Sequence, residues 1–297
     1  MRQFTRFALF MVIALGLVAG CKKKNKSVSV PQEVKKVAEA AAKELGNKPL
    51  ATVAFNLQSL IKSPLFGVLK PKMEKAISEK LPCANSFLDQ GKDLILVLDE
   101  LKPDSEDPKG FYMVLKGIPS KKFFACVQKA KDAKFTKAKL GGQDAYMVEE
   151  DGEKTYFFAG SDKAIVAVAG SYVKKVVPGK GVMGKGLLPG SGSDTLAFEV
   201  GAVKILSGVR GIIDASKGLN IKVSVGFKEK DMAEMVEMGY EAQKDKKGAF
   251  PPGTEKFIKK LSVHRSGATI TAKIDLSESD IKELVPMIMS QVMKRGM

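Results

Sequence analysis

The segment that decides the fold is KFTKAKLGGQDAYMVEEDGEKTYFFAGSDKAIVAVA, residues 134–169. Apolar and polar residues alternate in it over short runs, which is the period of a half-buried β-strand. The runs are separated by Gly141-Gly142, Asp151-Gly152 and Gly160-Ser161, and Asp-Gly between alternating runs is a strong hairpin signal. The apolar positions are Phe135, Tyr146, Val148, Tyr156, Phe158, Ile165 and Val168. We therefore predict an antiparallel meander.

The chain before the meander mixes helices and strands. Apolar residues recur at helical spacing from Pro31 to Leu45, and Gly46 closes this amphipathic helix. Its expected buried positions are Val34, Val37, Ala38, Ala41 and Leu45. Further expected elements are a strand at 51–55, helical pieces around Ser63-Pro64 and Pro71, strands at 93–101 and 110–118, a helix capped by Ser120, and a short helix at 171–177.

A stretch rich in Gly and Pro, residues 178–193, follows the meander and predicts a flexible connector. Beyond it we expect a strand at 195–200, a helix at 203–215, a strand at 220–227, a helix carrying Met232, Met235, Val236 and Tyr240, a hairpin around Ser266-Gly267 and a helix capped by Ser277. The predicted organisation is a signal peptide at 1–20, a tether with one amphipathic helix at 21–49, a first half at 50–178, a connector at 179–193 and a second half at 194–297.

The order of elements recurs after the connector, and short sequence matches accompany the recurrence. The matches are Thr52-Val53-Ala54-Phe55 with Thr195-Leu196-Ala197-Phe198, Gly117-Ile118 with Gly226-Phe227, and Val176-Val177-Pro178 with Leu284-Val285-Pro286. The predicted class is α+β, with antiparallel sheets, helices packed on one face and two similar halves. Two layers that resemble each other without duplication are the alternative.

Composition places the chain among globular proteins. It has 297 residues, 44% of them apolar and 28% charged, with three Cys, one His and no Trp. Disordered, collagen-like and disulfide-scaffold proteins have different compositions, so these classes are excluded.

The N-terminal sequence predicts where in the cell the protein is located. Arg2 and Arg6 precede an uncharged apolar run at 7–19, which is too short to span a bilayer and suits a secretory signal. The residues Leu17-Val18-Ala19-Gly20-Cys21 resemble the lipobox of bacterial lipoproteins. The resemblance implies that diacylglycerol is attached to the thiol of Cys21, that the chain is cut before Cys21, and that the new amino group is acylated in many bacteria. An ordinary cleaved signal is the alternative.

The lipobox implies a bacterial envelope protein anchored by lipid on the periplasmic side of a membrane. In the family's sorting pattern Asp after the lipidated cysteine retains the protein at the inner membrane, and Lys22 stands there instead, which favours the outer membrane. Removing residues 1–20 takes two Arg from the formal charge of +16 and leaves +14. Export argues against nucleic acid as the partner, so an anionic envelope component or an apolar ligand is preferred. The run Lys22–Lys26 predicts a solvated tether, with attraction to anionic headgroups as the alternative.

Two cysteines, Cys83 and Cys126, remain once Cys21 is acylated, and an exported compartment is oxidising. We predict a disulfide between them, which would contribute about 4 kcal/mol by the chain-entropy estimate. Two separate buried thiols are the alternative.

No catalytic, metal-binding or cofactor-binding residue is predicted. The single histidine, His264, is placed on the polar face of a strand, and a pair with Ser266 would lack a visible acid and oxyanion donors. Gly179–Lys185 approaches a phosphate-binding loop, but Gly186 stands where Ser or Thr is needed. The acidic runs 104–107 and 149–151 are interpreted as solvated loops, because paired acids for catalysis must face each other across a cleft.

The leading functional hypothesis is a non-catalytic binding or assembly module at a membrane surface. Two alternatives stay open, a carrier of lipid or another apolar ligand and an envelope hydrolase. Met232, Met235 and Met238 are expected to fill a core, with an apolar binding surface as the alternative.

Overall fold

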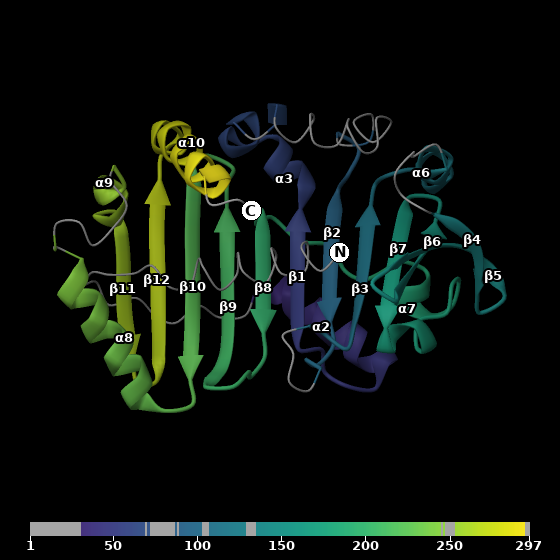
Figure 1. Cartoon of the computed structure of the whole chain (residues 1–297), viewed down its shortest axis with the longest axis horizontal. Coiled ribbons are helices and arrows are strands. Elements are labelled where there is room, and N and C mark those ends of the chain that lie inside the picture. The colour runs from purple at the N-terminus through teal and green to yellow at the C-terminus, as the bar shows by residue number, and fades with distance from the viewer. Residues whose placement is uncertain are drawn as a thin grey trace.

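Within the described residues, twelve strands form one continuous antiparallel sheet (Figure 1). A computed structural model of the chain describes residues 31–68, 70–71, 87, 89–102, 107–128, 135–244, 246 and 253–294. The strand order is β11-β12-β10-β9-β8-β1-β2-β3-β7-β6-β5-β4. Strands β1 and β8 pair at the centre, so residues before and after the Gly-rich connector belong to a single sheet.

The strands are β1 Ala51–Asn56, β2 Asp93–Leu98, β3 Gly110–Lys116, β4 Thr136–Leu140, β5 Gln143–Glu150, β6 Glu153–Ser161, β7 Ala164–Gly170, β8 Leu196–Val200, β9 Leu206–Asp214, β10 Leu219–Phe227, β11 Leu261–Ser266 and β12 Thr269–Leu276. The helices are α2 Gln32–Leu45, α3 Leu57–Ile61, α6 Ser120–Val127, the 3₁₀ helix η2 Ser171–Lys174, α7 Gly181–Gly184, α8 Lys230–Gln243, α9 Glu255–Ile258 and α10 Glu278–Lys294. The predicted α+β class and the predicted meander, β4 to β7, are confirmed.

Helices cover both faces of the sheet, which corrects the expectation that they pack on one face. Neighbouring residues of a strand point to opposite faces. Val114 belongs to the core that contains α2 and α7, whereas Leu115 packs in the core under α6. We call the side with α2 and α7 the back face and the side with α6 the front face. Helices are needed on both faces because some strands are apolar on both sides. In β7, for example, Ala164 to Ala169 are all buried.

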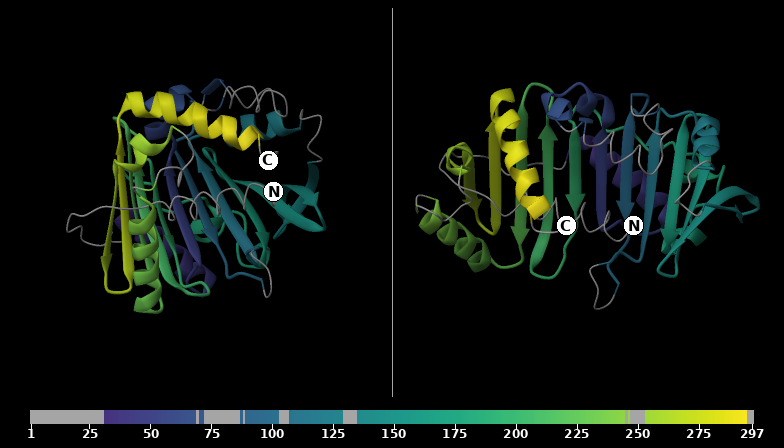
Figure 2. Two further views of the ribbon diagram at one scale, coloured as in Figure 1. Left: turned by 60° about the vertical axis from the view of Figure 1, so that its left-hand side comes forward. Right: turned by 45° about the horizontal axis from the view of Figure 1, so that its top comes forward.

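Helices α8 and α10 also lie on the front face. Helix α8 packs against Val263 and Ala272, and α10 lies across the upper ends of β10 and β12, where Ile274 belongs to its core (Figure 1, Figure 2). The predicted cap of α10 is confirmed, since the Ser277 amide donates to Asp280 Oδ2 at 2.7 Å and the Asp280 amide donates to Ser277 Oγ at 3.3 Å. This reciprocal pairing satisfies donors at the start of the helix.

Helix α2 matches its prediction residue for residue. Its buried side chains are the five apolar residues expected from the spacing. Gly46 follows it with φ +77°, a left-handed conformation that glycine adopts without strain. The whole apolar stripe of α2 therefore faces the back of the sheet.

The predicted helix at 203–215 is wrong, because this segment is strand β9. Gly208 and Gly211 disfavour a helix, and the β-branched residues Val209, Ile212 and Ile213 suit a strand. A Cβ at Gly211 would lie 2.7 Å from Cζ of Phe198 and 2.8 Å from the carbonyl oxygen of Lys222. The glycine thus admits an aromatic ring from β8. The predicted helix at 171–177 is shorter than expected, since only η2 forms.

The Gly-rich segment 179–193 is packed rather than flexible, which corrects a second expectation. Met183 and Leu188 are fully buried. A Cβ at Gly184 would lie 1.9 Å from the carbonyl oxygen of Val177, so this glycine serves a close backbone approach. A carboxylate oxygen of Glu44 on α2 accepts hydrogen bonds from the amides of Val182 and Met183 at 2.7 and 3.0 Å. These contacts fix the segment to the back face.

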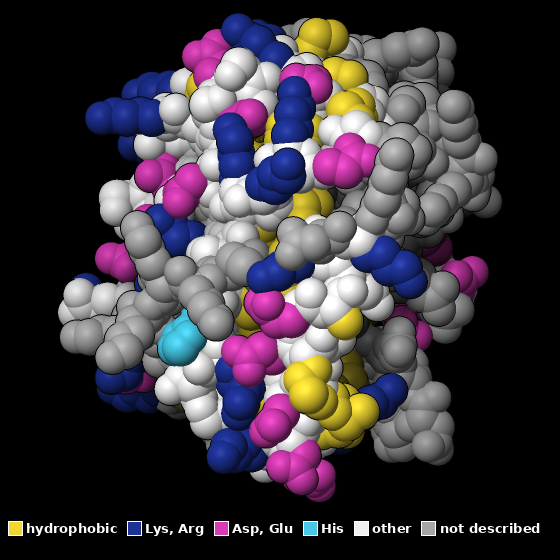
Figure 3. Space-filling view, turned by 90° about the vertical axis from the view of Figure 1, so that its left-hand side faces the viewer, with side chains coloured by type: hydrophobic (Ala, Val, Ile, Leu, Met, Phe, Trp, Pro, Cys, Tyr) yellow, Lys and Arg dark blue, Asp and Glu magenta, His cyan; other side chains and the backbone are white. Residues whose placement is uncertain are grey.

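The methionines of α8 divide between core and surface. Met232 packs on the front-face core, whereas Met235 and Met238 are 62% and 57% exposed. Figure 3 shows apolar side chains at the surface on the side of the molecule that carries α8. The core-filling expectation is wrong for these two residues.

Candidate binding cleft

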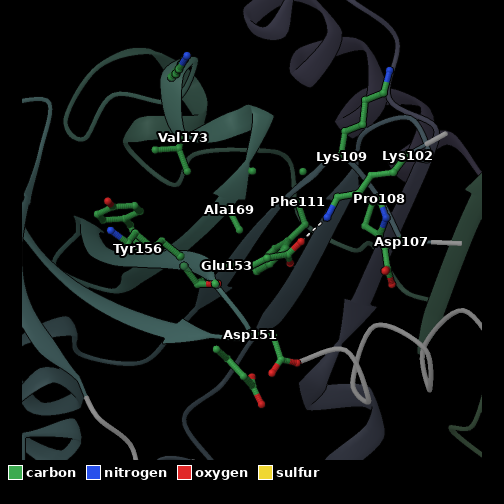
Figure 4. Close-up of a pocket in the computed structure, with 17 residues that line it drawn as sticks. Lys102, Asp107, Pro108, Lys109, Phe111, Asp151, Glu153, Tyr156, Ala169 and Val173 are labelled. Atoms are coloured by element: carbon green, nitrogen blue, oxygen red, sulfur yellow. Dashed lines mark hydrogen bonds and ion pairs between the residues drawn. The ribbon is translucent and has the colours of Figure 1, made fainter. Parts of the chain in front are cut away.

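A cleft of about 450 Å³ opens where β3 begins and β7 ends (Figure 4). Two turns form its walls, the segment before β3 and the Asp151-Gly152 turn between β5 and β6. Register brings them together, since Gly110 pairs with Gly170 and Thr155 pairs with Ala169. Ligand clefts in proteins are commonly about 300–1,000 Å³, so this one has the size of a small-ligand site.

The lining of the cleft combines an apolar part with a charged rim. Phe111, Tyr156, Ala169 and Val173 contribute the apolar part. The charged lining residues are Lys102, Lys109, Lys154, Lys174, Asp107, Glu150, Asp151 and Glu153. The two signs are balanced in number, so the rim favours neither anions nor cations as a class.

Several rim charges are paired across the loops. Lys102 Nζ donates to Glu153 Oε1, which joins the segment before β3 to β6. Lys109 Nζ donates to Glu100 Oε2 at 2.8 Å, and this hydrogen bond together with the charge of Glu100 raises the pKa of Lys109. These side chains are substantially exposed, and exposed ion pairs are weak. A charged ligand could replace either partner at little cost.

A buried carboxylate, Asp99, supports the wall of the cleft. It accepts hydrogen bonds from Ser171 Oγ, from the amide of Glu100 at 2.9 Å and from Asn47 Nδ2 at 3.2 Å. These bonds connect the end of α2, the end of β2 and the start of η2. Because η2 supplies Val173 and Lys174 to the cleft, Asp99 fixes their backbone in place.

The pKa of Asp99 links this support to pH. Burial alone would raise the pKa, but the three hydrogen bonds and the charge of Lys175 outweigh burial and hold it below its ordinary value. A carboxyl with a lowered folded-state pKa stabilises the fold above its unfolded pKa of about 4 and loses that contribution as pH falls through the folded pKa.

We therefore expect Asp99→Asn to lower the free energy of unfolding at pH 7 and to flatten its decline below about pH 4. Urea unfolding at a series of pH values measures both effects. The matched control is Asp275→Asn, because Asp275 is an exposed carboxylate paired with Lys273. Parallel pH curves for wild type and Asp99→Asn would contradict the assignment.

The structure brings together acidic residues that the sequence presents as separate loops. Asp107 from one acidic run and Glu150 and Asp151 from the other line the same cleft. Residues 104–106 of the first run lie outside the described residues. Sequence reasoning missed the cleft, since more than forty residues separate the two runs and only the pairing of β3, β7 and β6 joins them.

The other candidate residues lie away from the cleft. His264 is on β11, which forms the edge of the sheet farthest from β4, and it pairs with Thr271 of β12. Its predicted position, on the strand face opposite Leu261 and Val263, is confirmed. Residues 179–185 partly match the sequence of a phosphate-binding loop. In the structure, the amides of Val182 and Met183 in this segment donate hydrogen bonds to the carboxylate of Glu44.

Only one of the three cysteines is among the described residues. Cys126 on α6 is buried on the front face and is disulfide-bonded. Cys21 and Cys83 lie outside the described residues, so the pairing of Cys83 with Cys126 and the lipidation of Cys21 stay predictions.

Comparison with protein families, curated proteins and solved structures gives no significant match to this chain. Among the described residues, no three His, Cys, Asp or Glu side chains are grouped so that they could hold a metal ion. Among the same residues, no helix is long and apolar enough to cross a membrane.

Proposed function

We propose that this protein is a lipid-anchored envelope lipoprotein whose body is a non-catalytic binding module on the periplasmic side of a membrane, the outer membrane being favoured. The lipobox ending in Cys21 supports the anchor, and Lys22 supports the choice of membrane. The observation that carries the binding role is the cleft, whose apolar lining is surrounded by exchangeable charges of both signs.

The lining suggests the chemistry of the ligand. The apolar lining next to Lys102 and Glu153 fits a small ligand that has an amino group at one end, a carboxylate at the other end and an apolar portion between the two groups. A short peptide with free termini has this chemistry. Each terminus would replace one partner of a rim ion pair, and its body would cover Phe111 and Val173.

Calorimetric titration with tetra-alanine tests the proposal. We expect saturable binding of the peptide with free termini to the mature protein. Acetylation of the amino end or amidation of the carboxyl end should weaken binding by about tenfold or more, because a hydrogen bond to a charged group contributes about 1.5–3 kcal/mol. Lys102→Gln combined with Glu153→Gln should lose the discrimination between free and capped peptides.

The matched control is Lys282→Gln combined with Glu278→Gln, an exposed ion pair of 2.7 Å on α10. This variant should bind tetra-alanine as wild type does. Absence of saturable binding by folded wild-type protein, or equal binding of free and fully capped peptides, would contradict a peptide-binding cleft.

We also propose that the body consists of two similar halves related by a two-fold axis at the centre of the sheet. The strand order outward from the central pair supports this, being β1-β2-β3-β7-β6 on one side and β8-β9-β10-β12-β11 on the other. Helices α6 and α8 follow β3 and β10, respectively. Ala54 pairs with Ala197, and these two residues also align in the repeated four-residue match, as a two-fold axis between β1 and β8 requires.

A carrier of an apolar ligand is the second candidate, and the front face of the central strands favours it. The side chains of Val53, Phe55, Leu94, Leu96, Met113 and Leu196 share this face and are only half-buried. Mass spectrometry of lipids that co-purify with the protein separates the candidates, since a carrier retains a stoichiometric lipid in addition to its own acyl chains.

A further inference from the structure

Two exposed apolar side chains, Val182 and Leu187, stand next to each other on the back of the molecule. Their exposed fractions are 39% and 59%. The amide of Leu187 donates to the carbonyl oxygen of Val182 at 2.8 Å, so the two residues are held as a pair. The cleft does not use this pair, and neither residue contributes to the sheet.

The exposure of the pair is imposed by well-packed neighbours. Met183 and Leu188, each next in sequence to one member of the pair, are fully buried in the back-face core. Glu44 fixes the start of α7 through the amides of Val182 and Met183. Val182 and Leu187 therefore point outward from a rigid support.

Exposed lysines lie close to the pair along the chain. Lys180 precedes Val182 by two residues, Lys185 lies between Val182 and Leu187, and Lys43 is in the last turn of α2, next in sequence to Glu44. In the described part of the chain none of these three lysines has an ion-pair partner. The carboxylate of Glu44 accepts hydrogen bonds from the amides of Val182 and Met183 in α7. Apolar side chains next to lysines are typical of segments that lie in the interface of an anionic membrane.

The position of the pair also suits a membrane contact. Nine residues separate Cys21 from Pro31, the residue before α2, and the ten Cα–Cα steps between these two residues can reach about 35 Å when extended. Helix α2 has 14 residues and is about 20 Å long at about 1.5 Å per residue. Since α7 is fixed to the far end of α2, the pair lies about one helix length from the point where the tether enters. The tether is long enough for the back face to lie on the bilayer.

We propose that Val182 and Leu187 insert into the headgroup region of an anionic bilayer while Lys180 and Lys185 bind lipid phosphates. The inference rests on the lipid anchor in the proposed function and adds a second attachment that orients the body. The back face then lies on the membrane, and the front face is turned toward the aqueous compartment.

The absence of tryptophan from the sequence gives a direct test. Leu187→Trp in the mature acylated protein, reconstituted into vesicles of phosphatidylglycerol and phosphatidylethanolamine with brominated acyl chains, places the only indole at the proposed contact. We expect a blue-shifted emission and loss of roughly half or more of the intensity, because interfacial segments bury their apolar side about 5–10 Å into the bilayer. Met235→Trp is the control, since Met235 is 62% exposed on α8 at the front face. Its emission should stay unshifted and unquenched.

The outcomes separate the inference from the anchor. Unquenched Leu187→Trp in protein that floats with the vesicles would overturn the membrane contact and leave the anchor intact. Equal quenching of both variants would also overturn it, by indicating adsorption without orientation. Failure to float would show that the anchor itself is wrong. Lys180→Glu and Lys185→Glu, added to Leu187→Trp, should reduce quenching, and unchanged quenching would contradict the role of the lysines.

Discussion

A Cys21→Ala protein is expected to lose all incorporation of labelled palmitate and to leave the membrane fraction. The thiol of Cys21 is the acceptor that the lipobox implies, and alanine cannot form the thioether. Each buried methylene contributes about 0.8 kcal/mol, so two or three acyl chains hold a protein on a bilayer far more firmly than one. The apolar run at 7–19 is too short to span a membrane in their place.

The matched control is Cys126→Ser, which removes a different sulfur. Because Cys126 is disulfide-bonded and lies on α6, its loss should leave palmitate incorporation unchanged. Mass spectrometry of the N-terminal peptide should show acylated Cys21 in wild type and in Cys126→Ser. Full palmitate incorporation in Cys21→Ala would contradict the lipoprotein proposal.

The fold was predictable where one segment contains its own signal. Helix α2 has a single apolar stripe, a glycine end and an exposed opposite side, so its periodicity is sufficient. The meander β4 to β7 is similarly local, because each turn pairs strands adjacent in sequence. Such elements need no knowledge of distant partners.

The errors occur where distant segments decide the structure. Strand β9 lies between β8 and β10 and packs apolar residues on both faces, Val209 on the front and the partly buried Ile212 on the back, so its sequence lacks the alternation that marks a half-buried strand. Its Gly211 is explained only by Phe198 and by the Lys222 carbonyl, which lie on neighbouring strands. The cleft has the same origin, since Asp107 and Glu150 meet only through the pairing of β3, β7 and β6.

The Gly-rich segment shows why composition alone misleads. Its glycines suggest flexibility, yet Gly184 permits a close backbone approach, and Gly186 lies where a Cβ would be 2.8 Å from the Ala164 side chain. Glycine is required at such contacts because it has no Cβ, not because the chain moves. From one sequence, a packed glycine and a flexible glycine look the same.

Two adjacent leucines in this segment give the sharpest test of its packing. Leu188→Ala is expected to lower the free energy of unfolding by about 2–5 kcal/mol, because a fully buried leucine leaves a cavity when it is truncated. Leu187→Ala, one residue away and 59% exposed, should change it by no more than about 0.5 kcal/mol. Urea unfolding measures both, and equal slopes with shifted midpoints would assign the difference to stability.

The pair of variants also keeps folding and membrane contact separate. If Leu187→Ala leaves stability intact, any loss of vesicle contact in that variant comes from the surface and not from a damaged core. If Leu188→Ala is as mild as Leu187→Ala, segment 179–193 is not part of the back-face core. The support that holds Val182 and Leu187 outward would then be missing, and the membrane contact would lose its structural basis.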